Sequence, residues 1–228
     1  NLTSLGDPLP FYIGVLWCTS PDSAGPGYGS FIDGIPSNGI FSDTIYNFTP
    51  LKNYCVWAYA ENAAGPAYGK RVEFFSYKPT PPAIGNGTEK NPYQIATWED
   101  LLWLSQSPKV WGYGNNFIQT ADIRFPKNNA SWYKNQGWPS IGNASTNFMG
   151  SYNGQYHTIT GLSISRPSTD YIGLFGYVYS ATIQNIGLIG VDVTGHDYVG
   201  GLIGHSALLS NIRNCYVDGS VNGNSYVG

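Results

Sequence analysis

Apolar and polar positions recur regularly in the last third of the chain. Similar segments begin at Tyr171, Tyr198 and Tyr226, and in each the tyrosine is followed by a β-branched residue and then by glycine. These tyrosines are 27 and 28 residues apart. A fixed period of this length is typical of repeat proteins, in which each unit buries its apolar face against its neighbour. The pattern therefore predicts a stack of coils.

A six-residue pattern with apolar first, fourth and sixth positions occurs three times, at 159–164, 183–188 and 212–217. Aligning the copies predicts that like positions lie above one another in short parallel strands, about 4.8 Å apart. Glycine is expected at the corners, where φ must be positive. The predicted columns are Ile159 with Ile183 and Ile212, Leu162 with Ile186 and Cys215, and Ile164 with Leu188 and Val217.

The region before the repeats predicts the start of this stack. Short alternating segments indicate strands at 93–95 and 116–123, and the segment between them predicts a helix over 97–105. Thr97 is suited to the N-cap, and two acidic residues follow at the positive end of the helix dipole. We expect this largely apolar helix to cover the first coil, because an open β edge with an exposed core promotes aggregation.

Turn-rich stretches separate candidate strands in the first third of the chain. These strands are 11–17, 39–48, 54–60 and 71–75. A segment rich in proline and glycine follows them and indicates a domain boundary. We therefore divide the chain into a β-sandwich domain over 1–78, a linker over 79–90 and a capped stack of coils over 91–228. We expect the stack to continue beyond residue 228, because a repeat has only just begun there.

Composition limits the class of protein. Of the 228 residues, 42% are hydrophobic and only 11% are charged, and the chain contains 29 glycines and 18 tyrosines. This mixture favours a globular all-β protein with frequent corners. The net charge of −3 and the scattered cations disfavour nucleic acid, and no apolar run is long enough to span a bilayer. We expect an extracellular or cell-surface location.

The three cysteines are too far apart in sequence for a zinc cage or a redox motif. Cys18 and Cys55 are predicted near the end of one strand and the start of its antiparallel neighbour. A disulfide between these two and a pair of unbridged thiols both remain open, because a cross-strand disulfide must meet tight geometry. Cys215 is expected in the core.

Candidate chemistry is sparse. The few acidic residues beyond residue 157 do not form the carboxylate pair that glycoside hydrolysis requires, so no catalytic residue is predicted. Asp170 and Asp197 each precede a repeated tyrosine and should lie above one another. They could share a Ca²⁺ ion, or each could cap its own turn. No other cofactor is expected.

Aromatic residues are concentrated between residues 98 and 138. Their flat faces could stack on sugar rings or contact a protein partner, or they could instead seal the start of the stack. The candidate binding residues are Trp103, Trp111, Tyr113, Trp132 and Tyr133.

Two segments of the chain resemble known protein families. Residues 85–228 resemble the GLUG-repeat family of bacterial surface and secreted proteins, with the name motif at 173–176 and 201–204 and related segments at 138–142 and 148–154. This resemblance implies a right-handed parallel β-helix and a role in adhesion, and it supplies no catalytic residues. Residues 48–69 resemble the closing half of a fibronectin type III-like domain, which looks incomplete because only ten residues precede its first predicted strand.

The leading hypothesis is a non-enzymatic adhesin at the bacterial cell surface, or secreted, that binds a glycan or a host protein. Its fold is expected to be all-β, with a partial immunoglobulin-like or fibronectin type III-like sandwich before the β-helix and its capping helix. Two alternatives are a fragment of a carbohydrate-active β-helix enzyme, such as a polysaccharide lyase or hydrolase, and a purely structural surface stalk.

Overall fold

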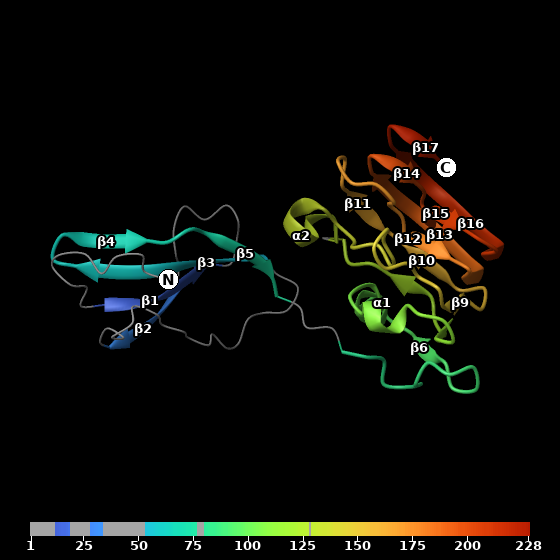
Figure 1. Ribbon diagram of the computed structural model, residues 1–228, viewed down its shortest axis with the longest axis horizontal. Helices are drawn as coiled ribbons and strands as arrows, with labels where there is room; N and C mark the ends of the chain where they lie inside the picture. Colours follow the sequence, from blue (N-terminus) through green and yellow to red (C-terminus); the bar gives the residue numbers. More distant parts are fainter. Residues whose placement is uncertain (1–11, 19–27, 34–52, 77–79, 128) are drawn as a thin grey trace. The chain divides into compact units, whose positions relative to one another are not determined.

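The computed structural model describes residues 12–18, 28–33, 53–76, 80–127 and 129–228 (Figure 1). The described chain is mostly β-strand, as the sequence predicts. It divides into two compact units, Asn1–Tyr77 and Lys78–Gly228, which are considered separately. The predicted strand at 39–48 lies outside the described residues. No helix in the described ranges is long and apolar enough to cross a membrane.

The first unit contains an antiparallel sheet. Its strands are β1 (Tyr12–Cys18), β2 (Tyr28–Asp33), β3 (Asn53–Asn62), β4 (Gly65–Tyr68) and β5 (Val72–Phe75). They are ordered β2-β1-β3-β4, and β5 also pairs with β3. The strands predicted at 11–17, 54–60 and 71–75 correspond to β1, β3 and β5. Cys18 is directly opposite Cys55 in the β1–β3 register.

The second unit begins with the predicted strand and helix, β6 (Tyr93–Ile95) and α1 (Trp98–Ser105). Thr97 is the N-cap, and its side chain accepts a hydrogen bond from the backbone N–H of Asp100, whose carboxylate in turn accepts from the N–H of Thr97. This reciprocal pair satisfies N–H groups that the first helical turn leaves without partners. The helix packs against β6, with the Trp103 ring 4.9 Å from that of Tyr93.

The remaining elements form coils that stack on one another. The strands are β7 (Asn116–Gln119), β8 (Ile123–Arg124), β9 (Ser151–Asn153), β10 (Thr158–Thr160), β11 (Ser163–Ser165), β12 (Phe175–Tyr179), β13 (Thr182–Thr194), β14 (Asp197–Val199), β15 (Ile203–Ala207), β16 (Asn211–Asn222) and β17 (Ser225–Val227). The short helices are η1 (Pro108–Val110), η2 (Asn129–Ser131) and α2 (Trp132–Asn135). Figure 1 shows β10, β13 and β16 lying side by side towards the C-terminus.

All pairs of these strands are parallel. The largest sheet has the order β6-β7-β9-β13-β10-β8, and β13 also pairs with β11 and β16. Two smaller sheets join β12 to β15 and β14 to β17. The long strand β13 therefore contacts three short strands of the preceding coil and one long strand of the next. Each coil is hydrogen-bonded to its neighbours along most of its length.

The predicted columns are present in the last two coils. Ile183 pairs with Ile212, and Leu188 pairs with Val217. Cys215 pairs with Ile186 as predicted, but it is only partly buried rather than in the core. Like residues therefore stack along the axis of the coils.

The alignment of the first copy, 159–164, was wrong. Ile159 pairs with Leu188 rather than with Ile183, which lies opposite Tyr152 instead. Leu162 consequently falls in the register of Val191, away from the column of Ile186 and Cys215.

The repeated apolar spacing of β13 explains this five-residue error. The apolar spacing occurs twice in succession in β13, over 183–188 and again over 188–193, so spacing alone fits either register. The corner after β9 is also two residues longer than its counterpart in β13, and it includes Gln155 and Tyr156, both with positive φ. A corner of different length shifts every later position of that coil.

The last glycine of each GLUG segment permits a close approach of the backbone. A Cβ atom at Gly176 would lie 2.5 Å from the carbonyl oxygen of Tyr171, and one at Gly204 would lie 2.7 Å from that of Tyr198. Atoms cannot pack this closely, so any side chain at these positions would push the strand away from the tyrosine segment. The motif therefore reflects the tight return of the chain within each coil.

Side chains of a single column are buried to different extents, so their substitution by alanine should lower stability by different amounts. Ile183 is completely buried, whereas Ile212, its partner in the column, is 39% exposed. We expect Ile183→Ala to lower the free energy of unfolding by about 2–5 kcal/mol. Ile212→Ala should cost at most about 1–2 kcal/mol, because less apolar surface is lost from the interior. Urea unfolding measures both, and equal costs would contradict a column buried from coil to coil.

Candidate functional site

The three repeated tyrosines form a ladder on one corner of the stack, which we call the tyrosine corner. The ring centroids of Tyr171 and Tyr198 are 5.0 Å apart at an interplanar angle of 16°, and those of Tyr198 and Tyr226 are 4.6 Å apart at 2°. The spacing matches that of stacked coils. Tyrosines recurring in the sequence therefore stack face to face.

The backbone at this corner is strained. Tyr171, Tyr198 and Tyr226 have φ values of 61°, 57° and 53°, in the left-handed region that costs a residue with a Cβ about 1–2 kcal/mol. Such strain persists only where the surroundings enforce it, and it often marks a functional position. Here the backbone N–H of Tyr171 donates to the carbonyl of Asp197, and that of Ile172 donates to the carbonyl of Tyr198.

Two further rings complete the tyrosine corner. His205, on β15, lies 4.7 Å from Tyr177 on β12 and 5.0 Å from Tyr198, measured between ring centroids. Tyr177 and His205 are paired residues of the β12–β15 sheet, and Tyr171 also contacts both. All of these rings are partly or largely exposed. The result is an aromatic cluster that remains accessible at its outer edges.

Polar side chains lie next to the tyrosines and join one coil to the next; we call this group the Asp–His latch. Nδ1 of His196 is 2.8 Å from Oδ1 of Asp170, and the backbone N–H of Asp197 donates to the same oxygen at 3.2 Å. One coil further, Asn224 Nδ2 donates to Asp197 Oδ1 at 3.1 Å. Each aspartate therefore accepts a side-chain hydrogen bond from the next coil. The donor is the residue immediately before the one that stacks on the aspartate.

The Asp–His latch shifts the protonation of both partners. The hydrogen bond to Asp170 raises the pKa of His196, and the nearby carboxylate of Asp197 adds to the rise. The hydrogen bonds from His196 and from the Asp197 backbone lower the pKa of Asp170. A general acid needs a raised pKa to hold its proton near neutral pH. Asp170 is shifted in the opposite direction and remains ionised.

The Asp–His latch contains Asp170 and Asp197, the two residues that the sequence suggested as a candidate metal site. The ligand atoms of Asp170, His196 and Asp197 all lie within 4.8 Å of one another. Sequence analysis had paired the two aspartates but had not found His196. Two carboxylates and one imidazole suit Zn²⁺ or Mn²⁺ better than Ca²⁺, which takes six to eight oxygen ligands.

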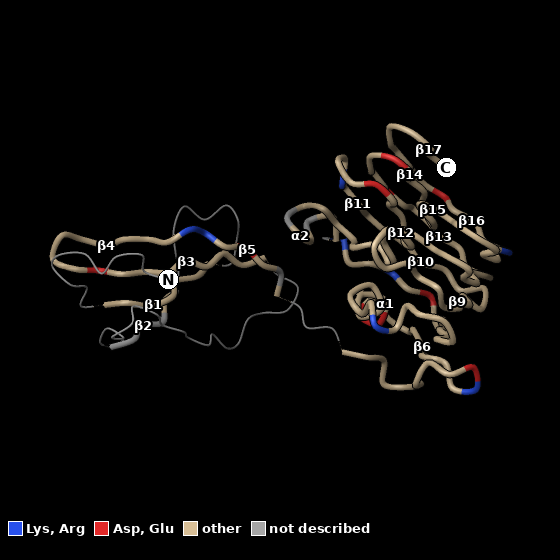
Figure 2. Tube along the Cα trace, in the orientation of Figure 1, with Lys and Arg blue, Asp and Glu red and all other residues tan. Residues whose placement is uncertain are grey.

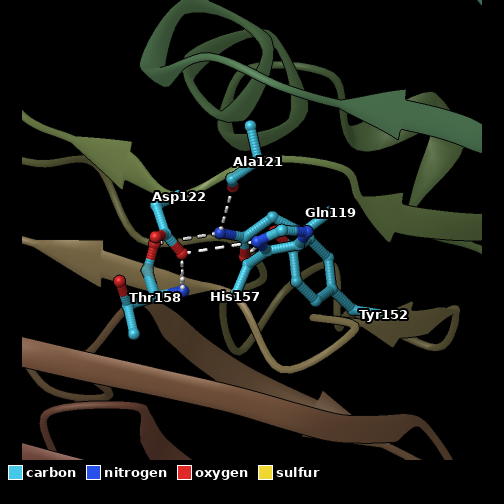
Figure 3. A network of polar contacts seen from close by, with 6 residues as sticks. All are labelled: Gln119, Ala121, Asp122, Tyr152, His157 and Thr158. Carbon is cyan, nitrogen blue, oxygen red and sulfur yellow. Dashed lines mark hydrogen bonds and ion pairs between the residues drawn. The ribbon is translucent and has the colours of Figure 1, made fainter.

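A second aspartate–histidine contact lies in an earlier coil (Figure 3). Oδ1 of Asp122 accepts from the backbone N–H of Thr158 at 2.8 Å and lies 3.4 Å from Nδ1 of His157. Beside it, the buried Gln119 donates to the carbonyl oxygens of Ala121 and Thr158 and accepts from the hydroxyl of Tyr152. These contacts satisfy a polar side chain that would otherwise be costly to bury.

The candidate aromatic binding residues are mostly inside the protein. Trp103, Trp111 and Trp132 are buried, and the indole N–H of Trp111 donates to the carbonyl of Leu104 at 2.7 Å. Tyr133 is partly exposed and contacts Gln106, while Tyr113 is 68% exposed. The three tryptophans fill the core at the start of the stack and expose little surface to a partner.

Sequence reasoning missed the tyrosine corner as a surface. The tyrosine repeat was treated only as a sign of architecture, and His205 was assigned no role. The usable signal was the recurrence of an aromatic residue at one position of every repeat. Charged residues gave no such signal, since Figure 2 shows them scattered sparsely through the second unit.

Comparisons with known proteins agree with the repeat pattern. Residues 195–222 match the family model described as the GLUG motif, which confirms that this motif is present. The chain is 37% identical over 149 residues to Halomucin of Haloquadratum walsbyi, a match covering 63% of this chain and 2% of that protein. It is 34% identical over 116 residues to a putative Gly-rich membrane protein of Evansella cellulosilytica, covering 49% of this chain and 12% of that protein.

The chain thus spans only a small part of either relative. No solved structure matches it significantly.

The Asp–His latch predicts a measurable pH dependence. The raised pKa of His196 gives stability below its unfolded value of about 6.5, which is lost as pH rises through the folded pKa. The lowered pKa of Asp170 gives stability above about 3.9, which is lost as pH falls through the folded pKa. In a proton NMR titration we expect the His196 midpoint above about 6.5, and Asp170→Asn should lower it. Asp192→Asn is the charge-matched control, and an equal change there would argue against the latch.

Proposed function

We propose that this chain is part of a non-enzymatic cell-surface or secreted protein, and that its second unit is a right-handed parallel β-helix acting as a rigid spacer. The observation that carries this proposal is the stacking of like side chains in register from coil to coil. Such a structure gains length and stability by adding similar units, without any change to its interior.

The surface location is supported by the two relatives. One is named Halomucin and the other a putative membrane protein, and in both the matched region is a small part of a much longer protein. The GLUG motif at 195–222 agrees with the same assignment. We extend it to a bacterial surface protein on the strength of the family resemblance.

We also propose the domain division suggested by the sequence, with a β-sandwich over 1–78, a linker over 79–90 and the β-helix over 91–228. The sheet order β2-β1-β3 followed by β4 and β5 agrees with the C′-C-F-G sheet of an immunoglobulin-like or fibronectin type III-like domain. In this assignment β1 is strand C and β3 is strand F.

The spacer proposal predicts that extra coils can be inserted. Four tandem copies of residues 196–223 placed before His196 should add about 19 Å to the stack, at about 4.8 Å per coil. Ser165 and Asn222 lie in one column, since each pairs with Thr194. Spin labels at these two exposed positions, with the native cysteines replaced by serine, should therefore move apart by about 19 Å in pulsed electron spin resonance.

A matched insert carries Asn at the positions of Ile212, Val217 and Val221 in every copy. We expect this insert to unfold or to give a broad label distance, because its coils cannot bury an apolar column. The same distance gain for both inserts, or no gain for the native one, would refute the spacer proposal.

A second candidate function, recognition of a glycan or host protein, is favoured by the tyrosine corner. Its partly exposed rings present the aromatic surface that sugar and protein partners use. We expect binding on a glycan array or to extracellular matrix proteins to fall at least about tenfold in a Tyr177→Ala, Tyr226→Ala variant. Tyr156→Ala is the control, because Tyr156 is 77% exposed at a different corner. Absence of any binding leaves the spacer as the function.

A further inference from the structure

Two cysteines face each other in the first unit. Cys18 ends β1 and pairs directly with Cys55 on β3, in an uninterrupted register that begins with Tyr12 opposite Glu61. Both are buried, with 2% and 1% of their surfaces exposed. Directly opposed residues of an antiparallel pair project from the same face of the sheet. The two side chains therefore share one enclosed space.

The structure holds both cysteines as thiols, and their placement is compatible with a disulfide bond. Opposed residues of antiparallel strands have Cα atoms about 4.5–5.5 Å apart, within the range of about 4.4–6.8 Å found for disulfides. Their Cβ atoms, about 4.5–5.5 Å apart, need to approach only slightly to reach the usual distance of about 3.5–4.5 Å. We propose that Cys18 and Cys55 form a disulfide bond in the mature protein, a modification that goes beyond the proposed spacer function.

Arg71 sets the electrostatics beside this pair. Its Nη2 donates to Sγ of Cys55 at 2.8 Å, and the guanidinium also contacts Glu73 at 3.2 Å and lies over the ring of Trp57. A cation this close favours the thiolate, which is the form that attacks a disulfide. Burial and the hydrogen bond to Cys18 act more strongly and raise the pKa of Cys55. Burial in the closed sheet therefore slows attack by the Cys55 thiolate.

The reaction is thiol–disulfide exchange with a low-molecular-weight disulfide, such as oxidised glutathione. The Cys55 thiolate attacks one sulfur of glutathione disulfide, forming a mixed disulfide and releasing one glutathione thiolate. The Cys18 thiolate then attacks the Cys55 sulfur, forming the protein disulfide and releasing the second glutathione. Two cysteine protons are lost to solvent or to the released thiolates, and the two electrons remain on two reduced glutathione molecules.

The disulfide bond would link β1 to β3 and close a long loop of the chain. Cys18 and Cys55 are 37 positions apart in sequence, and closing a loop of this size removes much of the conformational freedom of the unfolded chain. Secreted domains with small cores commonly depend on such bonds.

The test is to count reactive cysteines. The full chain is refolded in a mixture of reduced and oxidised glutathione, and it is then denatured and alkylated with iodoacetamide. Its intact mass is measured by mass spectrometry. We expect one alkylated cysteine per chain, and all three after reduction. Peptide mapping should show Cys215 alkylated and a linked peptide pair containing Cys18 and Cys55. Reduction should also lower the melting temperature of the first unit by at least about 5 °C.

Cys215→Ser is the matched control and should retain the bond, whereas Cys18→Ser and Cys55→Ser should each abolish it. If either of these variants fails to fold, the alkylation count of the unaltered chain still decides. Three alkylated cysteines after oxidative refolding, or a linked peptide containing Cys215, would overturn the proposal.

Discussion

Parallel hydrogen bonding between adjacent coils fixes the register of the second unit, and the apolar columns and the tyrosine corner depend on that register. It places Ile183 on Ile212 and Tyr198 on Tyr226. Polar residues obey the same rule, since Asn214 Nδ2 donates to Asn185 Oδ1 at 2.9 Å, and Asn185 in turn donates to Asn153 at 3.0 Å. The environment of a residue is therefore set by its position within the coil.

The interior and the corners of the stack consequently have different properties. Interior positions such as Ile183 and Leu188 are completely buried and carry apolar side chains. The corners direct side chains outwards, and some do so at positive φ, which is acceptable for asparagine but costly for tyrosine. The hydrogen bonds between coils hold the tyrosines in this strained conformation, so the stack offsets its energetic cost. We therefore expect a recognition surface at a corner, and the tyrosine corner is the candidate that we propose.

The sequence predicted features that depend on local or equal spacing. Thr97 defined the start of α1 because capping involves only neighbouring residues, and Ile183 was aligned with Ile212 because their coils match closely in length. Ile159 was misplaced because the apolar spacing occurs twice in β13, five residues apart, so spacing alone does not select the register. The burial of Trp132 and the pairing of His196 with Asp170 were not predictable, since composition does not say which face a residue occupies and the two partners lie on different coils.

The two units reach stability by different physical routes. Each additional coil of the second unit brings its own apolar column and its own parallel hydrogen bonds, so stability can grow with length. In the first unit, the described strands form a single antiparallel sheet and contain no repeated column. A small sheet of this kind cannot be strengthened by repetition. A covalent link between β1 and β3 at Cys18 and Cys55 would supply the stabilisation that extra coils provide to the stack, and it would act by restricting the unfolded chain.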